Sequence, residues 1–234
     1  MKAEAGTFSR RLELARSTHA WDVSPKDAIQ IQAEFRSKVR QTPLGSYPLH
    51  RVAGIDVGFP RNKTVARAAI VLLEFPSLQI IEQTVAEMPV HFPYVPGLLS
   101  FREIPVILHA LERLHQMPDL LITDGHGLSH PRRFGLACHL GVLLDLSTIG
   151  CAKSILIGKH APLGTMRGST AALVAASECI GMAVRTRDGV KPVYISVGHW
   201  MDLPLSVKIM LACGGGYRLP EPTRLAHLLA SRTA

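Results

Sequence analysis

The sequence predicts one three-layer α/β domain in which a central mixed β-sheet lies between helices. Three apolar segments with strand character follow one another between residues 52 and 88, separated by short turns. From about residue 100 onward, helical and strand-like segments alternate to the end of the chain. Hydrophobic residues make up 47% of the 234 residues, which is enough for one large buried core. Together these features favour a mixed sheet covered by helices.

The three consecutive strands are expected to form an antiparallel meander. Residues 52–57, 65–75 and 78–88 are rich in Val, Ile and Leu, which favour strands. The connections at residues 60–63 and at Pro76-Ser77 are short enough for tight turns. Neighbouring strands in this region should therefore pair antiparallel.

The first 50 residues carry the weakest pattern, apart from one helix expected over residues 25–40. Ile31 and Phe35 recur on one face of that helix. We therefore expect an N-terminal helical extension, residues 1–50, that packs on a main domain of residues 51–234. The whole chain is then a single domain, as its length also suggests.

Helices and strands alternate in the second half of the chain. Ile107, Leu111 and Leu114 lie on one face of an expected helix, and a strand over residues 120–122 then runs into the glycine-rich loop 124–127. The remaining expected elements are a helix at residues 134–144, a strand at 148–151, a hairpin of 182–187 and 193–197, and helices after Asp202 and Pro222.

Composition restricts the partners and the compartment. The net charge of +8 favours a polyanion such as nucleic acid or an anionic membrane, although charge alone does not decide. No apolar run reaches the roughly 18 residues that cross a membrane, and no signal peptide is evident, so we expect a cytoplasmic protein. The four cysteines lack Cys-x-x-Cys spacing, which predicts buried reduced thiols. The absence of a nucleotide-binding glycine pattern argues against a nucleotide cofactor.

Two aspartates stand where an apolar strand ends. Asp56 follows Val-Ala-Gly-Ile, and Asp124 follows Leu-Leu-Ile-Thr. If the two strands are neighbours, both carboxylates meet at one edge of the sheet and can hold Mg²⁺. Taken singly, each Asp is better explained as a turn residue, because Asp next to Gly often opens a turn. The pair together favours a functional site.

Glu103 has two interpretations. Ser100-Phe101-Arg102-Glu103 matches a capping box, in which the Glu side chain bonds back to the amide of the N-cap residue. The alternative places Glu103 near Asp56 as a third acid. The spacing alone favours the cap.

Two loops contain residue types suited to nucleic acid. In Pro93-Tyr94-Val95-Pro96-Gly97 two prolines stiffen the backbone around an aromatic ring, which can act as a wedge between bases or pack as an ordinary turn. Ser129-His130-Pro131-Arg132-Arg133 offers an imidazole and two guanidinium groups. This second loop suits phosphate contacts, or is a solvated basic start of the next helix.

Two cationic or titratable side chains follow later in the chain. Lys153 comes after an expected strand, so it projects from the same sheet edge as the acids and can offset negative charge on a phosphate. Taken alone, it is more simply a surface lysine. His227 lies on the last helix and, like His139, His160 and His199, is interpreted alone as an ordinary surface or half-buried histidine.

Five segments of the chain resemble the endonuclease V family, the deoxyinosine 3′ endonucleases. The five occur in family order from about residue 52 to residue 227, which makes a chance match a poor explanation. Cys151 is the one departure, because a small aliphatic residue is expected there. The matching segments are Val52-Ala53-Gly54-Ile55-Asp56-Val57-Gly58-Phe59, residues 93–97 with 99–103, residues 124–133, Thr148-Ile149-Gly150-Cys151-Ala152-Lys153, and residues 216–224.

The resemblance implies an RNase H-like fold and a metal-dependent nuclease. It implies Mg²⁺ as the cofactor, with Mn²⁺ able to substitute, held by Asp56 and Asp124 with Glu103 as the third acid. Lys153 then faces the scissile phosphate, and His227 completes or tunes the metal site.

The resemblance also implies a recognition surface for a deaminated base. Tyr94 would be the centre of a wedge that fills the space left by the flipped base, flanked by Pro93, Val95 and Pro96. The residues that would form the hypoxanthine pocket are Gly97, Leu99, Gly125, His130 and Gly135.

The implied activity is DNA repair by hydrolysis of the second phosphodiester bond 3′ to deoxyinosine, leaving a 3′-hydroxyl and a 5′-phosphate. The same site can serve inosine in RNA, since nothing in the sequence shows how the 2′-hydroxyl is treated. A non-catalytic lesion-binding protein is a third alternative, against which the acids Asp56, Glu103 and Asp124 argue. We expect a monomer that acts on nucleic acid and not on a membrane.

Overall fold

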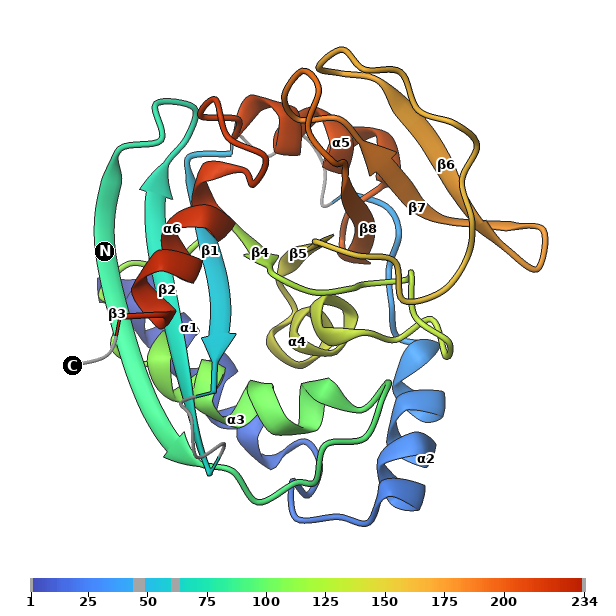
Figure 1. Cartoon of the computed structure of the whole chain (residues 1–234). Helices are drawn as coiled ribbons and strands as arrows, with labels where there is room; N and C mark the ends of the chain where they lie inside the picture. Colours follow the sequence, from blue (N-terminus) through green and yellow to red (C-terminus); the bar gives the residue numbers. More distant parts are fainter. Residues whose placement is uncertain (1, 44–48, 60–63, 233–234) are drawn as a thin grey trace.

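The computed structural model describes residues 2–43, 49–59 and 64–232. Within these residues the centre is an eight-stranded sheet of order β3-β2-β1-β4-β5-β8-β7-β6 (Figure 1). The pairs β1-β4 and β4-β5 are parallel, and the other neighbouring pairs are antiparallel. The strands are β1 (Arg51–Gly58), β2 (Val65–Glu74), β3 (Ile80–Pro89), β4 (Leu120–Thr123), β5 (Ser147–Ala152), β6 (Thr170–Ala175), β7 (Glu178–Val184) and β8 (Val193–His199).

Helices cover both faces of this sheet (Figure 1). Two helices, α3 and α4, lie against one face, and α5 and α6 lie against the other. The first two helices pack outside that first layer, α1 on α3 and α4, and α2 on α4. This arrangement confirms the RNase H-like, three-layer α/β fold with a central mixed sheet. The helices are α1 (Lys2–Ser17), α2 (Pro25–Arg36), α3 (Leu99–Leu111), α4 (Leu136–Leu144), α5 (Leu203–Ala212) and α6 (Glu221–Ala230).

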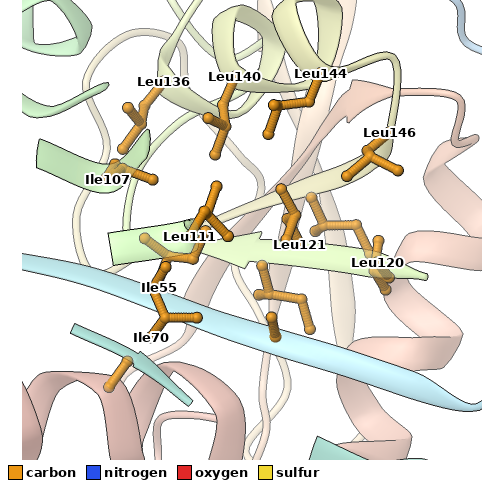
Figure 2. Close-up of a cluster of buried hydrophobic side chains, with 14 of the residues drawn as sticks. Ile55, Ile70, Ile107, Leu111, Leu120, Leu121, Leu136, Leu140, Leu144 and Leu146 are labelled. Atoms are coloured by element: carbon orange, nitrogen blue, oxygen red, sulfur yellow. The ribbon is translucent and has the colours of Figure 1, made fainter. Parts of the chain in front are cut away.

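The core between the sheet and the layer of α3 and α4 is almost entirely aliphatic. Ile55 of β1 and Leu121 of β4 meet Ile107 and Leu111 of α3 and Leu140 of α4, all at most 1% exposed (Figure 2). Burying each such side chain contributes about 1.5–3 kcal/mol to the free energy of unfolding. This packing fixes the strand ends from which the polar residues described below project.

The opposite face of β1 carries two glycines, and α6 packs directly against it. Gly54, Asp56 and Gly58 are every second residue of the strand and therefore lie on the same face. A Cβ atom at Gly54 would overlap the backbone of Pro222 in α6, and Gly58 is close-packed against the end of the same helix. The two glycines therefore let α6 approach β1, with Asp56 between them and His227 on the approaching helix.

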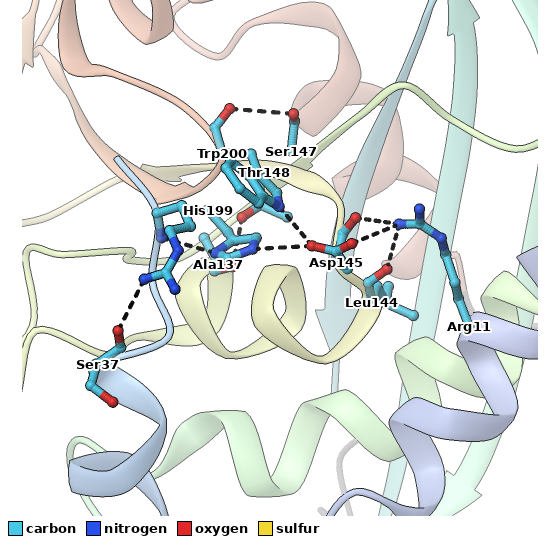
Figure 3. A network of polar contacts seen from close by, with 10 residues as sticks. Arg11, Ser37, Ala137, Leu144, Asp145, Ser147, Thr148, His199 and Trp200 are labelled. Carbon is cyan, nitrogen blue, oxygen red and sulfur yellow. Dashed lines mark hydrogen bonds and ion pairs between the residues drawn. The ribbon is translucent and has the colours of Figure 1, made fainter. Parts of the chain in front are cut away.

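The first helix, α1, is anchored to the end of α4. The Arg11 guanidinium donates to the Leu144 carbonyl at 2.9 Å and also bonds the carbonyl of Asp145, whose carboxylate lies 3.9 Å away (Figure 3). The Trp200 indole donates to the same carboxylate at 2.7 Å. Free carbonyls at a helix C-terminus attract cationic side chains, so Arg11 secures α1 to the fold.

Most strand predictions are confirmed. Strands β1, β2 and β3 form the expected antiparallel meander, and β7 and β8 form the expected hairpin. The turn expected at residues 60–63 lies outside the described residues. The helix expected to reach residue 40 ends at Arg36. Three of the cysteines are buried as predicted, but Cys179 is exposed, because it lies at the start of β7 near the rim of the sheet.

Sequence reasoning missed α1 and the edge strand β6. In α1 the charged residues hide a buried stripe of Phe8, Leu12 and Ala15, each at most 4% exposed and spaced as one helical face. His139 and His199, interpreted as surface or half-buried residues, are also corrections, because both are buried. Among the described residues, none of the helices is long and apolar enough to cross a membrane.

Candidate active site

The two aspartates predicted at strand ends lie next to each other in the structure. Asp56 is on β1, and Asp124 directly follows β4, which pairs with β1 in parallel. The amide of Asp124 donates to the Ile55 carbonyl at 2.9 Å, so the two strands are still joined where the acids project. Both carboxylate side chains are 12% exposed. Parallel neighbouring strands bring their carboxyl ends to one edge, which explains the convergence.

A histidine and a lysine balance these two acids. His227 Nδ1 lies 2.8 Å from Asp56 Oδ2, and Lys153 Nζ lies 2.5 Å from Asp124 Oδ2. The Lys153 ammonium is also 3.4 Å from His227 Nδ1. All four groups therefore share one small region at the sheet edge, half open to solvent, which we call the acidic centre.

The donor set of the acidic centre fits a divalent cation. One ligand atom each from Asp56, Asp124 and His227 lies within 4.8 Å of the others. Carboxylate oxygens suit Mg²⁺ and Mn²⁺, and an imidazole is compatible with Mn²⁺. The Lys153 ammonium beside Asp124 also indicates that this position attracts a positive charge.

The electrostatics of Asp124 favour a cation as well. Burial raises the pKa of the Asp124 carboxyl, its hydrogen bond from Lys153 lowers it, and the Asp56 carboxylate raises it again. Two like charges this close repel each other, and a shared cation removes that repulsion.

Glu103 lies near the acidic centre and does not cap its helix. The N-cap of α3 is Leu98, without a side-chain cap bond, and Ser100 Oγ lies 3.0 Å from His139 Nδ1 instead. The capping-box interpretation is therefore wrong, because a tertiary partner takes the Ser100 hydroxyl. Glu103 is 6% exposed, and its pKa is raised well above the usual range. Burial is the largest cause, and the negative charges of Asp56 and Asp124 add to it. It is not one of the three residues whose ligand atoms cluster within 4.8 Å.

The loop of residues 93–97, which we call the wedge loop, holds a tyrosine away from the protein. Tyr94 is 72% exposed, and Pro93 and Pro96 beside it are exposed too. Val95 anchors the loop by packing on a small cluster that includes Phe101. Tyr94 is therefore not the packed side chain of an ordinary turn.

The loop of residues 124–135, which we call the pocket loop, is packed through its glycines and His130. A Cβ atom at Gly135 would collide with the His126 carbonyl, and one at Gly125 would press on Leu136. His130 is 4% exposed, and burial together with the charge of Arg132 lowers its pKa to about 4, so its imidazole is neutral at pH 7.

The two arginines of the pocket loop are engaged within the protein. Arg133 Nε pairs with Glu178 at 2.7 Å, and its Nη1 donates to the His130 carbonyl. Arg132 is half-buried and donates to Gly97 and to Gln32. These bonds brace the loop, so the two arginines are not a freely solvated helix start. Leu99, at the start of α3, is 36% exposed.

Gln32 of α2 is a polar residue near these loops that sequence reasoning missed. It is 1% exposed on the face that α2 buries with Ala28 and Phe35. The sequence could have pointed to Gln32, because it lies on the apolar face of its helix and a buried amide needs hydrogen-bond partners. Only the fold shows that those partners lie in the wedge and pocket loops.

The fold and the acidic centre fit a class of protein, the metal-dependent nucleases, in which carboxylates hold divalent cations beside a phosphodiester. A sequence model of one family, described as Endonuclease V, matches residues 33–228. The chain belongs to the endonuclease V family.

Relatives and solved structures agree with this assignment. The chain is 49% identical to the endonuclease V of Trichormus variabilis over 213 residues, covering 91% of this chain and 96% of that one. The crystal structure of Streptomyces avermitilis endonuclease V superposes with a TM-score of 0.86 at 44% identity, covering 90% and 93% of the chains. Ciona intestinalis endonuclease V, in complex with a 24mer DNA containing an inosine followed by a ribo-adenosine, gives a TM-score of 0.75 at 25% identity, covering 88% and 95%.

Proposed function

We propose that this nuclease recognises deoxyinosine in DNA and hydrolyses the second phosphodiester bond on its 3′ side, leaving a 3′-hydroxyl and a 5′-phosphate. The observation that carries the proposal is the acidic centre, with Asp56, Asp124, His227 and Lys153 at one sheet edge. The inosine-containing DNA bound to the Ciona intestinalis relative supports the substrate. The net charge of +8 supports binding to a polyanion.

In this proposal Asp56 and Asp124 hold Mg²⁺, or Mn²⁺ in its place, with Glu103 as a third acid and His227 completing the site. The bound cation would lower the pKa of an attacking water and neutralise charge on the phosphate. The water oxygen forms a bond to phosphorus, the bond to the 3′-oxygen breaks, and that oxygen takes a proton. Lys153 stabilises the negative charge that develops on the phosphoryl oxygens.

The wedge and pocket loops supply recognition in this proposal. Tyr94, flanked by Pro93, Val95 and Pro96, fills the space in the base stack when the deaminated base is flipped out. Flipping costs a few kcal/mol and less at a mismatch, which favours the lesion over normal pairs. The residues proposed to line the pocket for hypoxanthine are Gly97, Leu99, Gly125, His130 and Gly135.

We also propose that residues 1–50 are an extension packed on a nuclease domain of residues 51–234. The contributions of Phe8, Leu12 and Phe35 to the main hydrophobic core support one cooperative unit. A single unfolding transition, seen equally by tryptophan fluorescence and circular dichroism, would agree with this proposal.

The test is a cleavage assay on matched oligonucleotides with one inosine or one adenine, in DNA and in RNA, with Mg²⁺ or EDTA. We expect one nick in the inosine DNA, one nucleotide beyond the lesion, that EDTA abolishes. Stronger cleavage of the RNA strand would replace the substrate by inosine in RNA. Equal cleavage of inosine and adenine strands would refute lesion recognition.

A further inference from the structure

One backbone carbonyl at the base of the wedge loop accepts hydrogen bonds from three side chains. The Gly97 oxygen lies 3.1 Å from Gln32 Nε2, 2.9 Å from His130 Nε2 and 2.6 Å from Arg132 Nη2. Since a carbonyl oxygen has two lone pairs, three donors saturate it. The Gly97 carbonyl, which these three side chains hold, lies only three residues after Tyr94 in the wedge loop.

Gln32 joins the wedge loop to the pocket loop. Besides its bond to Gly97, its Nε2 atom is 3.3 Å from the Phe134 carbonyl of the pocket loop. Its Oε1 atom accepts from Arg132 Nε at 2.5 Å. A single buried amide on α2 therefore uses both of its polar ends to tie the two loops together.

The other two donors are themselves fixed in place. His130 Nδ1 accepts the Arg132 backbone N–H at 3.2 Å, so the neutral ring carries its proton on Nε2 and donates to Gly97. Gly97 has a φ of +79°, and a Cβ atom there would lie 2.8 Å from Arg132 Nη2. The carbonyl is therefore held in one orientation, and Gln32 supplies the restraint that comes from outside both loops.

We infer that Gln32 is a positioning residue for lesion recognition, which sets the wedge loop against the pocket loop and makes α2 part of the substrate-selecting surface. This inference rests on the proposed function. Among the described residues, no hydrogen bond joins Gln32 to Asp56, Asp124, Lys153 or His227. Its loss should therefore act on substrate binding far more than on the chemical step.

Two variants separate the roles of the amide. Gln32→Met keeps the size of the side chain and removes every hydrogen bond. Gln32→Glu keeps an acceptor for Arg132 and removes the donor to Gly97 and Phe134. The matched control is Gln30→Met, an exposed glutamine on the same helix.

The measurements are kcat and KM for an inosine-containing DNA strand in Mg²⁺, and the ratio of inosine to adenine cleavage. Both Gln32 variants should raise KM by about tenfold, the effect of losing hydrogen bonds to a buried group, with a smaller change in kcat and a lower inosine selectivity. Gln30→Met should behave as wild type.

Several outcomes would overturn the inference. They are an unchanged KM in both Gln32 variants, a loss confined to kcat, or wild-type selectivity in Gln32→Glu. Thermal unfolding of each variant identifies a folding defect, and if Gln32→Met unfolds, the isosteric Gln32→Glu decides alone. Wild-type protein that leaves inosine strands intact would instead refute the proposed function, so the two failures are distinguishable.

Discussion

The acidic centre and the pair formed by the wedge loop and the pocket loop are held together by different forces. In the centre, charge balances charge, with Lys153 against Asp124 and His227 against Asp56. In the loops, the Gln32 amide, the neutral His130 imidazole and the Arg132 guanidinium all donate to one carbonyl, that of Gly97. Paired charges at a half-open edge can exchange one partner for a cation or a phosphate. A saturated carbonyl offers no free position and preserves a shape.

The same contrast is visible in the protonation of the two regions. Burial and the neighbouring Asp56 raise the pKa of Asp124, so this carboxyl responds to any added cation. Burial lowers the pKa of His130 to about 4, so its imidazole stays neutral over the physiological range. The centre is therefore built to respond to ions, whereas the loops are built to stay constant.

Removing a carboxylate should have the largest effect and should leave the loops intact. We expect Asp56→Ala to lower the rate of Mg²⁺-dependent cleavage at saturating substrate by about 10³-fold or more, because cation binding contributes several kcal/mol to transition-state stabilisation. Single-turnover kinetics on an inosine strand measure this rate. A variant that keeps a tenth of the wild-type rate would show that Asp56 is not a metal ligand.

Removing the lysine should have a smaller effect within the same region. Lys153→Ala is expected to lower the single-turnover rate by about 10²-fold, the usual loss when one charged stabiliser of an oxyanion is removed. Lys153→Arg keeps the charge and is the matched control, which should retain more activity. Equal rates for the two variants would mean that the charge itself does not matter.

Truncating the Tyr94 side chain should have a smaller effect than either change in the acidic centre, and it should act on binding. Stacking of a base on an aromatic ring contributes about 1–3 kcal/mol, so Tyr94→Ala should weaken affinity for an inosine strand by about 10–100-fold. Tyr94→Phe, which keeps the ring, should stay close to wild type. Fluorescence anisotropy in Ca²⁺ without turnover measures the affinity, and an Ala variant that binds normally would exclude a wedge.

The smallest expected effect concerns stability and pH. Burial, and to a lesser extent the charge of His19, lowers the pKa of His139 well below 6.5. In the unfolded chain the same imidazole takes up a proton near pH 6.5. Stability should therefore fall as the pH falls below about 6.5, by up to about 1.4 kcal/mol per such histidine at pH 5.5. Denaturant unfolding of wild type and His139→Gln at pH 7.5 and 5.5 tests this. The variant should lose less stability between the two values, and the exposed-histidine variant His91→Gln should match wild type.

Local pattern was enough to predict the strand ends and their acids. Asp56 and Asp124 end apolar runs, whereas the parallel pairing of β1 with β4, on which their meeting depends, is seen only in the fold. Lys153 was expected at the same sheet edge because it follows a strand, whereas His227 looks ordinary by itself and only the resemblance to the family placed it with the acids. Their meeting depends on α6 lying on Gly54 and Gly58, a contact between distant parts of the chain.

Other features could not be predicted because tertiary contacts override local signals. Glu103 matches a capping box, yet Ser100 turns to His139 and the helix begins two residues earlier, with Leu98 as its N-cap. Gln32 shows only that a polar side chain lies on a buried helix face, and its partners come from two loops far along the chain. Helix α1 was missed because its charged residues mask the short buried stripe of Phe8 and Leu12.

The most direct test measures two quantities for two variants on the same inosine DNA strand. The quantities are affinity in Ca²⁺ and single-turnover cleavage at saturating protein in Mg²⁺, for Asp124→Asn and for Tyr94→Ala. If the acidic centre performs chemistry and the loops perform recognition, Asp124→Asn should lose cleavage and keep affinity, and Tyr94→Ala should lose affinity and keep most of the saturated rate. If both variants lose both quantities to the same extent, the two regions do not divide the work, and the account is wrong.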